Sequence, residues 1–177
     1  MIAAAYTSIM KVRPVRLERM ICVNVNELLD RYLAGPARLR ESLAGLTEED
    51  LRYKYDPAKW SAKEIAIHVA DMDLVASFRM KRIIAEPDAR YPGVDQDLWA
   101  VGLGYQDRAM EPALRLLEAV RAEMGDVLAD LPAEAWSRKG LHTEAGEQSL
   151  RGILDVYTRH LESHVGQIMA IRERLGK

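Results

Sequence analysis

Two of the protein's four histidines, His160 and His164, lie four residues apart in the segment RHLESHVGQI. Four residues are about one turn of an α-helix, so both side chains would lie on one face of a helix. Apolar residues continue this face at the same spacing, which indicates that it is buried. A buried imidazole needs a partner at each ring nitrogen, because each unpaired polar group costs roughly 1–3 kcal/mol.

A third histidine, His68, interrupts the apolar stripe of a different amphipathic segment, which includes Ile65 and Met72. Three converging imidazoles would have a suitable partner in a divalent cation. Three protein ligands with a further position for water are the pattern of a catalytic zinc site. Histidines that are simply hydrogen-bonded within the core remain the alternative, which spacing alone does not exclude.

Four long helices are predicted to position these residues. Residues 25–34 indicate a short helix that Gly35-Pro36 breaks or kinks, with a new helix continuing to about residue 44. Ser61 and Glu64 have the spacing of a capping box at the start of the second helix. This helix carries His68 and ends before Pro87.

Two further helices are predicted over residues 108–130 and 150–175. Residues 87–107 are rich in proline and glycine, and we predict a long irregular crossover there. The turn-forming segment around Glu144-Ala145-Gly146 predicts a small β-hairpin before the last helix. Together these elements predict an all-α four-helix bundle, and such bundles build metal sites from side chains on facing helices.

The composition restricts the class of protein. A chain of 177 residues suits one domain, and its net charge of −2 offers no basic field for nucleic acid or an anionic membrane. No apolar run approaches the roughly 20 residues of a membrane span. The single cysteine, Cys22, fits a reducing cytoplasm. We interpret residues 1–22 as an N-terminal extension, with translation from Met20 as an alternative, and residues 23–177 as the domain.

The segments WSAKEIAIHVADMD and RHLESHVGQI together resemble the DinB-like superfamily. The chain is most similar to the YfiT branch of metal-dependent hydrolases, and the likeness includes RYPGVDQDLWA and LHTEAGE. The resemblance implies an up-down-down-up helix order and homodimers. It also implies one divalent metal ion, zinc or nickel, bound by His68, His160 and His164.

The resemblance leaves the reaction open. Activation of water would make the protein a hydrolase acting on a small-molecule substrate. Binding of a thiolate would make it an S-transferase for a low-molecular-weight thiol such as bacillithiol, as in relatives of the superfamily. A non-catalytic, stress-related metal or small-ligand binder and a pure interaction module are the remaining alternatives.

Four polar residues near the histidines are candidates to assist the metal. Glu64 could orient His68 or act as a base, although its capping role already explains it. Asp71 could accept an imidazole N–H or be solvated, and Gln167 could face the same cavity. Tyr157 could donate to a substrate, with core packing as the alternative.

Four further candidates lie farther away. Arg79 lies about 16 Å along the helix from His68, where it could bind a substrate carboxylate or form an internal salt bridge. Asp95 and Trp99 in the crossover could shape the substrate pocket. His142 in the hairpin is expected to be exposed and is a candidate proton shuttle.

Overall fold

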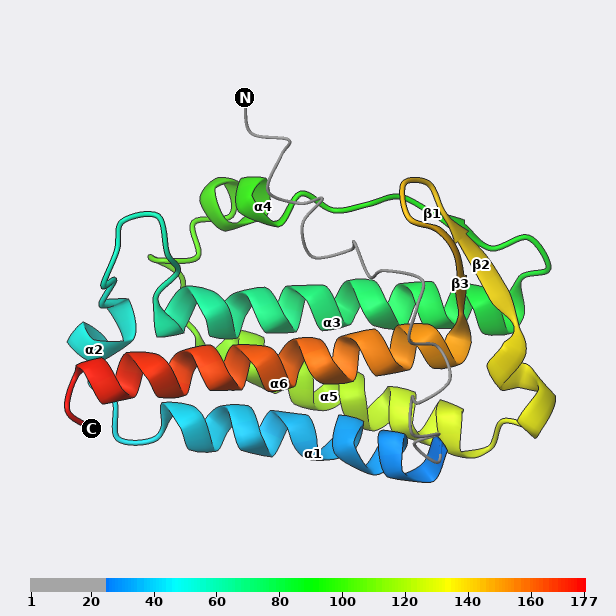
Figure 1. Cartoon of the computed structure of the whole chain (residues 1–177), viewed down its shortest axis with the longest axis horizontal. Coiled ribbons are helices and arrows are strands. Elements are labelled where there is room, and N and C mark those ends of the chain that lie inside the picture. The colour runs from blue at the N-terminus through cyan, green and yellow to red at the C-terminus, as the bar shows by residue number, and fades with distance from the viewer. Residues whose placement is uncertain (1–24) are drawn as a thin grey trace, which may run out of the picture.

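The computed structural model describes residues 25–177, and four long helices form its body (Figure 1). These are α1 (Val25–Leu43), α3 (Ala62–Ala85), α5 (Glu111–Ala129) and α6 (Leu150–Arg174). Helices α1 and α6 run in one direction and α3 and α5 in the other, while α1 and α3 each pack against both α5 and α6. The predicted four-helix bundle with up-down-down-up order is therefore confirmed. The predicted extension over residues 1–22, with Cys22 and Met20, lies outside the described residues.

Helix α1 continues through Gly35-Pro36, where the sequence predicted a break or kink. A proline at position 36 cannot donate the helical hydrogen bond to the carbonyl of Tyr32. The buried Arg121 replaces that donor, since its Nη1 lies 2.6 Å from the Tyr32 carbonyl oxygen. A side chain at position 35 would collide with the same guanidinium, so Gly35 leaves the space that Arg121 occupies.

Helix α3 begins as the sequence predicted. The Ser61 hydroxyl accepts from the Glu64 backbone N–H at 3.2 Å, and the Glu64 carboxylate accepts from the Ser61 N–H at 2.8 Å. These two bonds complete the capping box and fix the direction in which α3 leaves the preceding loop. The first turn of α3 leads directly to His68.

The crossover between α3 and α5 is more ordered than predicted. It contains β1 (Arg90–Tyr91) and the short helix α4 (Gln96–Gly102), which lies beside α3 in Figure 1. Asp95 caps α4 by accepting from two backbone N–H groups, at 3.1 and 3.0 Å. Helix α4 has only seven residues, which is too short for apolar periodicity to reveal it, and β1 depends on a partner about 50 residues away.

The predicted β-hairpin is present as β2 (Lys139–His142) and β3 (Gly146–Ser149). Gly146 has a φ of 79°, a conformation that glycine adopts without strain, and it lies opposite His142. Strand β1 pairs with β2 in parallel, giving a three-stranded sheet of order β1-β2-β3 at the end of the bundle where α6 begins. The remaining short elements are α2 (Glu48–Arg52) and the 3₁₀ helix η2 (Ala133–Ser137).

The apolar core is divided into two clusters along the bundle. One contains Ile65 and Leu117, and the other contains Met80 and Met124. His68, Asp73 and Arg121 come between these positions along α3 and α5, so buried polar groups occupy the middle of the bundle. Among residues 25–177, no helix is both long and apolar enough to cross a membrane.

Candidate metal centre

The three histidines singled out from the sequence converge on one point between α3 and α6. The Nε2 atom of His160 lies 3.1 Å from Nε2 of His68 and 3.1 Å from Nε2 of His164. His68 is fully buried and His164 is 8% exposed. Within residues 25–177, these three histidines form a group that could bind a metal ion. Each residue offers one ligand atom, and these atoms all lie within 4.8 Å of one another.

The opposite ring nitrogens show which atoms are available to a ligand. Nδ1 of His164 lies 2.9 Å from Oε1 of Gln167, and a proton on that nitrogen leaves the Nε2 lone pair facing the cluster. His160 Nε2 carries at most one proton, so one linear hydrogen bond accounts for only one of its two 3.1 Å contacts. Nδ1 of His68 and Nδ1 of His160 are buried without a hydrogen-bond partner.

Burial also keeps the imidazoles neutral, as metal ligands must be. Desolvation, together with the neighbouring histidines, lowers the pKa of His68 to about 2 and that of His160 to about 3. Burial lowers the pKa of His164 as well, although the hydrogen bond that His164 Nδ1 donates to Gln167 Oε1 acts in the opposite direction. Neutral imidazoles present lone pairs, which suit a divalent cation better than a proton.

The geometry fits a transition-metal ion. Two nitrogens that are each about 2.0 Å from a tetrahedral zinc ion lie about 3.3 Å apart. The two separations of 3.1 Å from His160 Nε2 are close to this value. Imidazole nitrogen suits zinc, nickel, copper and iron alike, so the donor set indicates a metal ion without selecting one. The three histidines could therefore hold a single divalent ion and leave positions for other ligands.

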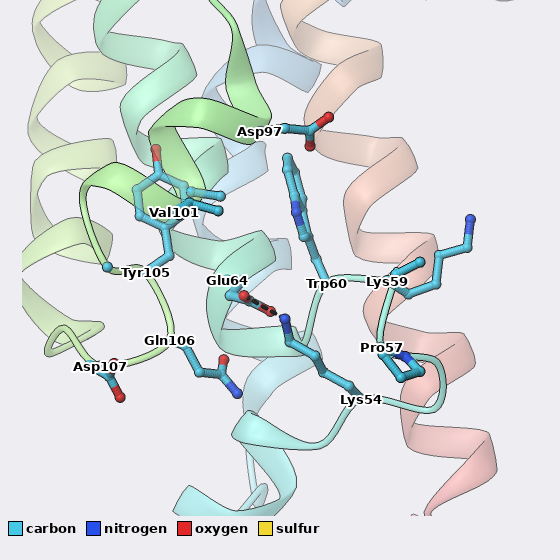
Figure 2. A pocket seen from close by; sticks show the side chains of 13 residues that line it. Lys54, Pro57, Lys59, Trp60, Glu64, Asp97, Val101, Tyr105, Gln106 and Asp107 are labelled. Atoms are coloured by element: carbon cyan, nitrogen blue, oxygen red, sulfur yellow. Dashed lines mark hydrogen bonds and ion pairs between the residues drawn. The ribbon is translucent and has the colours of Figure 1, made fainter. Parts of the chain in front are cut away.

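Trp60 forms one wall of the centre. Its ring lies 4.5 Å from that of His68 and 6.3 Å from that of His164, measured between ring centroids. Figure 2 shows the indole extending toward Asp97 of α4, on one side of a pocket of about 320 Å³. Trp60 directly precedes the N-cap Ser61 of α3, and its contact with His164 depends on the packing of α6 against α3.

Glu64 and Asp71 lie near the centre, but their bonds are made to other residues. The second Glu64 oxygen pairs with Lys54 Nζ at 2.7 Å, as the dashed line in Figure 2 shows. Asp71 accepts a hydrogen bond of 2.6 Å from the Tyr105 hydroxyl. The described contacts thus give both carboxylates structural partners, and their catalytic roles stay predictions.

Arg79 and Tyr157 meet beside the centre. Arg79 Nη1 donates to the Tyr157 hydroxyl at 2.8 Å, and the Tyr157 ring lies 5.9 Å from the ring of His160. Helical side chains point back toward the N-terminus of their helix, so the guanidinium lies closer to the histidines than the position of Arg79 along α3 suggested. Arg79 forms no salt bridge with any described acidic residue.

His142 is buried at 9% exposure, whereas the sequence analysis expected it to be exposed. Its Nδ1 accepts from the N–H groups of Glu144 and Ala145, both at 3.1 Å, and its ring packs against Tyr91. The pairing of β1 with β2 covers this histidine, and a hairpin considered alone could not reveal that. Burial, followed by the charge of Arg79, lowers the pKa of His142.

The two crossover residues have different surroundings. Asp95 serves as the N-cap of α4, where one carboxylate oxygen accepts both capping bonds. Trp99 packs against both core clusters and also lines a groove beside Arg79. Its position agrees with the predicted role in shaping a pocket, which stays a prediction.

The four-helix bundle and its three converging histidines are typical of helical-bundle proteins that build a metal site between facing helices. The family model of the DinB superfamily matches residues 31–168, and the chain belongs to that superfamily. It is 29% identical over 155 residues to a Geobacillus thermodenitrificans protein named "Putative metal-dependent hydrolase", with 86% of each chain covered. An Oceanobacillus iheyensis protein of the same descriptive name is 26% identical over 150 residues, covering 85% of this chain and 87% of its own.

Solved structures show the same fold. YfiT from Bacillus subtilis, described as a probable metal-dependent hydrolase with an unusual four-helix bundle topology, superposes with a TM-score of 0.83 at 19% identity and covers 91% of this chain and 93% of its own. A mycothiol-dependent maleylpyruvate isomerase superposes with a TM-score of 0.65 at 14% identity over 82% of this chain and 61% of its own.

Proposed function

We propose that the protein is a metal-dependent hydrolase acting on a small-molecule substrate. The convergence of the Nε2 atoms of His68, His160 and His164 carries this proposal. The names of the relatives and of the structural neighbour support it. A divalent ion bound there would lower the pKa of a bound water to about 7 and polarise a substrate carbonyl.

The protein's own residues would prepare the site for this chemistry. Gln167 orients His164 through their 2.9 Å contact and directs its lone pair inward. Trp60 covers the imidazoles and excludes bulk water from one side, which strengthens electrostatic interactions within the site. Tyr157, bonded to Arg79, places a polar hydroxyl beside His160.

An S-transferase that uses a low-molecular-weight thiol is the second candidate. The fold neighbour named as mycothiol-dependent is the observation that favours it. Incubation of the metal-loaded protein with bacillithiol and an electrophile would distinguish the two, because transfer consumes thiol and hydrolysis consumes water. Turnover of neither kind, despite bound metal, would favour a non-catalytic metal binder.

The first experiment measures metal content in protein that has never contacted a nickel column. Mass-spectrometric elemental analysis is expected to find about one zinc or nickel ion per chain. His68→Ala should lose the ion, and the control Ser163→Ala, an exposed position on the same helix as two of the ligands, should retain it. Full metal content in His68→Ala would contradict the assignment.

The second experiment measures turnover of a panel of esters and amides. We expect His68→Ala to lower kcat/KM by at least 1000-fold, since the metal would be lost, while circular dichroism stays unchanged. Ser163→Ala again serves as the control. Equal turnover of the two variants would show that the observed hydrolysis does not depend on this centre.

Assembly and location stay proposals. We propose a homodimer, and the exposed Leu98 and Val101 on α4 offer an apolar surface for it. Light scattering of the full chain tests this directly. Residence in the cytoplasm is expected from the cysteine content alone, and fractionation of cells would test it.

A further inference from the structure

Arg79 is a buried cation without an acidic partner in the described chain. The residue is 7% exposed, and its two hydrogen bonds go to neutral oxygens, the Tyr157 hydroxyl and the Pro92 carbonyl, both at 2.8 Å. Its Nε is buried and has no acceptor. Glu144 lies over the neighbouring Gly93, yet no carboxylate oxygen of residues 25–177 lies within 4.0 Å of the guanidinium. The charge of Arg79 is therefore not neutralised by the described chain.

The other buried cations of the described chain do have acidic partners. Lys63, at 5% exposure, pairs with Glu48 at 2.5 Å. Arg121, at 1% exposure, forms a bidentate pair with Asp73 at 2.8 and 3.0 Å. Burying a charge is costly unless an opposite charge and hydrogen bonds compensate for it. The exception at Arg79 points to an anion supplied by a ligand.

A groove provides the route by which such a ligand could reach Arg79. It encloses about 500 Å³ between the outer face of α3 and the segment from β1 to α4. Its walls are mostly apolar and include Leu74, Phe78, Val94 and Trp99. Phe78 is 54% exposed, so the groove is open to solvent. An apolar groove with a buried cation in its lining suits a small amphipathic acid.

The groove adjoins the metal centre through Tyr157. The hydroxyl of Tyr157 accepts from Arg79, and its ring lies 5.9 Å from the ring of His160. One side chain thus separates Arg79 from the histidines. A ligand bound to Arg79 would therefore place its adjacent atoms toward the metal centre.

We propose that Arg79 binds the carboxylate of a small organic acid whose apolar part lies along Leu74, Phe78 and Trp99. The identification of this acid as the substrate rests on the proposed hydrolase function. Binding of the acid to Arg79 requires no metal ion. A guanidinium recognises a carboxylate through paired N–H donors, and Arg79 has an unused Nε. The substrate class is therefore an amphipathic monocarboxylate.

The test compares two probes that differ only in charge, 3-phenylpropanoate and 3-phenylpropanamide. Each is titrated by calorimetry into the full chain after treatment with a chelator, so that a metal ion cannot bind the carboxylate. We expect the acid to bind about 10- to 100-fold more tightly than the amide, the range typical of hydrogen bonds to a charged group. Equal affinities would overturn the proposal.

Arg79→Met should abolish the preference for the acid and leave amide binding unchanged. The matched control is Lys81→Met, because Lys81 lines the same groove but is exposed and pairs with Glu123 at 2.9 Å. This control should keep the full preference. An undiminished preference in Arg79→Met, or its loss in Lys81→Met instead, would overturn the assignment to Arg79.

A surface variant keeps the test decisive if Arg79→Met fails to fold. Phe78→Asp places a negative charge at an exposed position of the groove, and Val156→Asp places one at an exposed position on α6. The first should weaken acid binding relative to amide binding and the second should not. Unchanged acid preference in Phe78→Asp would place the acid elsewhere. Acid binding without any hydrolysis would refute only the proposed hydrolase, and hydrolysis without acid preference would refute only this inference.

Discussion

Two buried arginines contact Tyr157, and they differ in how fully the chain satisfies them. Arg121 donates to the Tyr157 carbonyl at 3.1 Å, to the Tyr32 carbonyl at 2.6 Å and to both oxygens of Asp73. Arg79 donates to the Tyr157 hydroxyl and to one carbonyl, and its Nε has no acceptor. The chain neutralises the charge of Arg121 with Asp73, whereas no described acidic residue neutralises the charge of Arg79.

The difference follows the architecture. From α5, Arg121 reaches Tyr32 on α1, Asp73 on α3 and Tyr157 on α6, so a single side chain connects all four long helices. Arg79 and the histidines lie between α3 and α6, next to the crossover and its groove. Of the four buried side-chain N or O atoms without a hydrogen-bond partner in residues 25–177, three belong to Arg79, His68 and His160, and the fourth is the Tyr32 hydroxyl. The unpaired groups therefore lie mostly between α3 and α6.

The largest effect is expected from Arg121→Met. This change leaves Asp73 buried and without its partner, and breaking a buried ion pair in this way costs about 3–5 kcal/mol. Urea denaturation at pH 7 measures the loss in the free energy of unfolding. Arg79→Met leaves no carboxylate unpaired, and removal of its two hydrogen bonds to neutral groups should cost at most about 2–3 kcal/mol.

Equal losses in the two variants would contradict the division of the arginines into a structural and a ligand-binding one. The double variant Asp73→Leu/Arg121→Met provides a control for the mechanism. It removes both charges, so it should recover much of the stability that Arg121→Met loses. No recovery would assign the loss to packing instead of the unpaired carboxylate.

The next largest effect is the loss of stability at low pH. It tests whether the buried histidines, like Arg79, are left without a partner by the chain. Burial depresses the pKa of His68 to about 2 and of His160 to about 3, so the folded protein holds both neutral and unfolding lets them take up protons. Their contribution is present above the unfolded pKa of about 6.5 and is lost as pH falls. Metal-free protein should lose about 2–3 kcal/mol between pH 7 and pH 5.5.

This window is separate from that of Asp50. The Lys177 ammonium and Thr47 lower the pKa of Asp50 to about 2, so its contribution is lost only below its ordinary value of 3.8. His142 changes stability in the same direction as the cluster. His160→Leu should remove about half of the predicted loss, and an unchanged slope in that variant would show that the cluster does not cause it.

The histidine cluster could be predicted because it depends on local periodicity. His68 and the pair His160 and His164 interrupt apolar stripes at helical spacing, and each stripe is visible within one segment of the sequence. The capping box at Ser61 and the hairpin are local patterns too. The fold and the convergence of the three histidines therefore followed from short stretches of sequence and from the family resemblance.

The parts that could not be predicted depend on distant partners. Gly35-Pro36 has the local pattern of a helix break, and only Arg121, far along the chain, supplies the missing donor. His142 has the pattern of an exposed hairpin residue, and pairing with β1 buries it. The position of Arg79 suggested a distance from His68 along the helix axis, while its long side chain ends beside Tyr157.

A smaller effect is expected from Gln167→Ala, which tests how far the metal centre depends on its supporting bond. Loss of the 2.9 Å contact frees the His164 ring to rotate, and loss of such a supporting partner typically weakens metal binding about 10- to 100-fold. Competition with a chromophoric chelator measures the affinity. Met169→Ala, at 46% exposure on the same helix, is the control and should bind metal normally.

If Gln167→Ala binds metal as tightly as the parent protein, packing alone orients His164. Stability should change little in either case, because Gln167 is exposed and the helix continues beyond it. A large loss of stability would instead place Gln167 with Arg121 among the residues that hold the bundle together. The two measurements thus separate the contributions of this residue to the site and to the fold.

The smallest effect compares two serine helix caps that lie at different distances from the centre. Ser61 caps α3 and Ser149 caps α6, each by accepting a backbone N–H, from Glu64 at 3.2 Å and from Gly152 at 3.0 Å. Replacing either serine by alanine should cost about 1 kcal/mol in unfolding free energy. Ser61 also follows Trp60, whose ring lies 4.5 Å from that of His68.

Ser61→Ala should therefore weaken metal binding several-fold, because the wall formed by Trp60 loses its anchor, while Ser149→Ala should leave it unchanged. Ser61 further donates to Gln106 at 2.7 Å, a bond that ties the start of α3 to the segment after α4. Equal metal affinities in the two variants, with equal losses of stability, would show that the centre tolerates movement of Trp60. The imidazoles would then be held by α3 and α6 alone. The region around the three histidines would be as rigid as the network around Arg121.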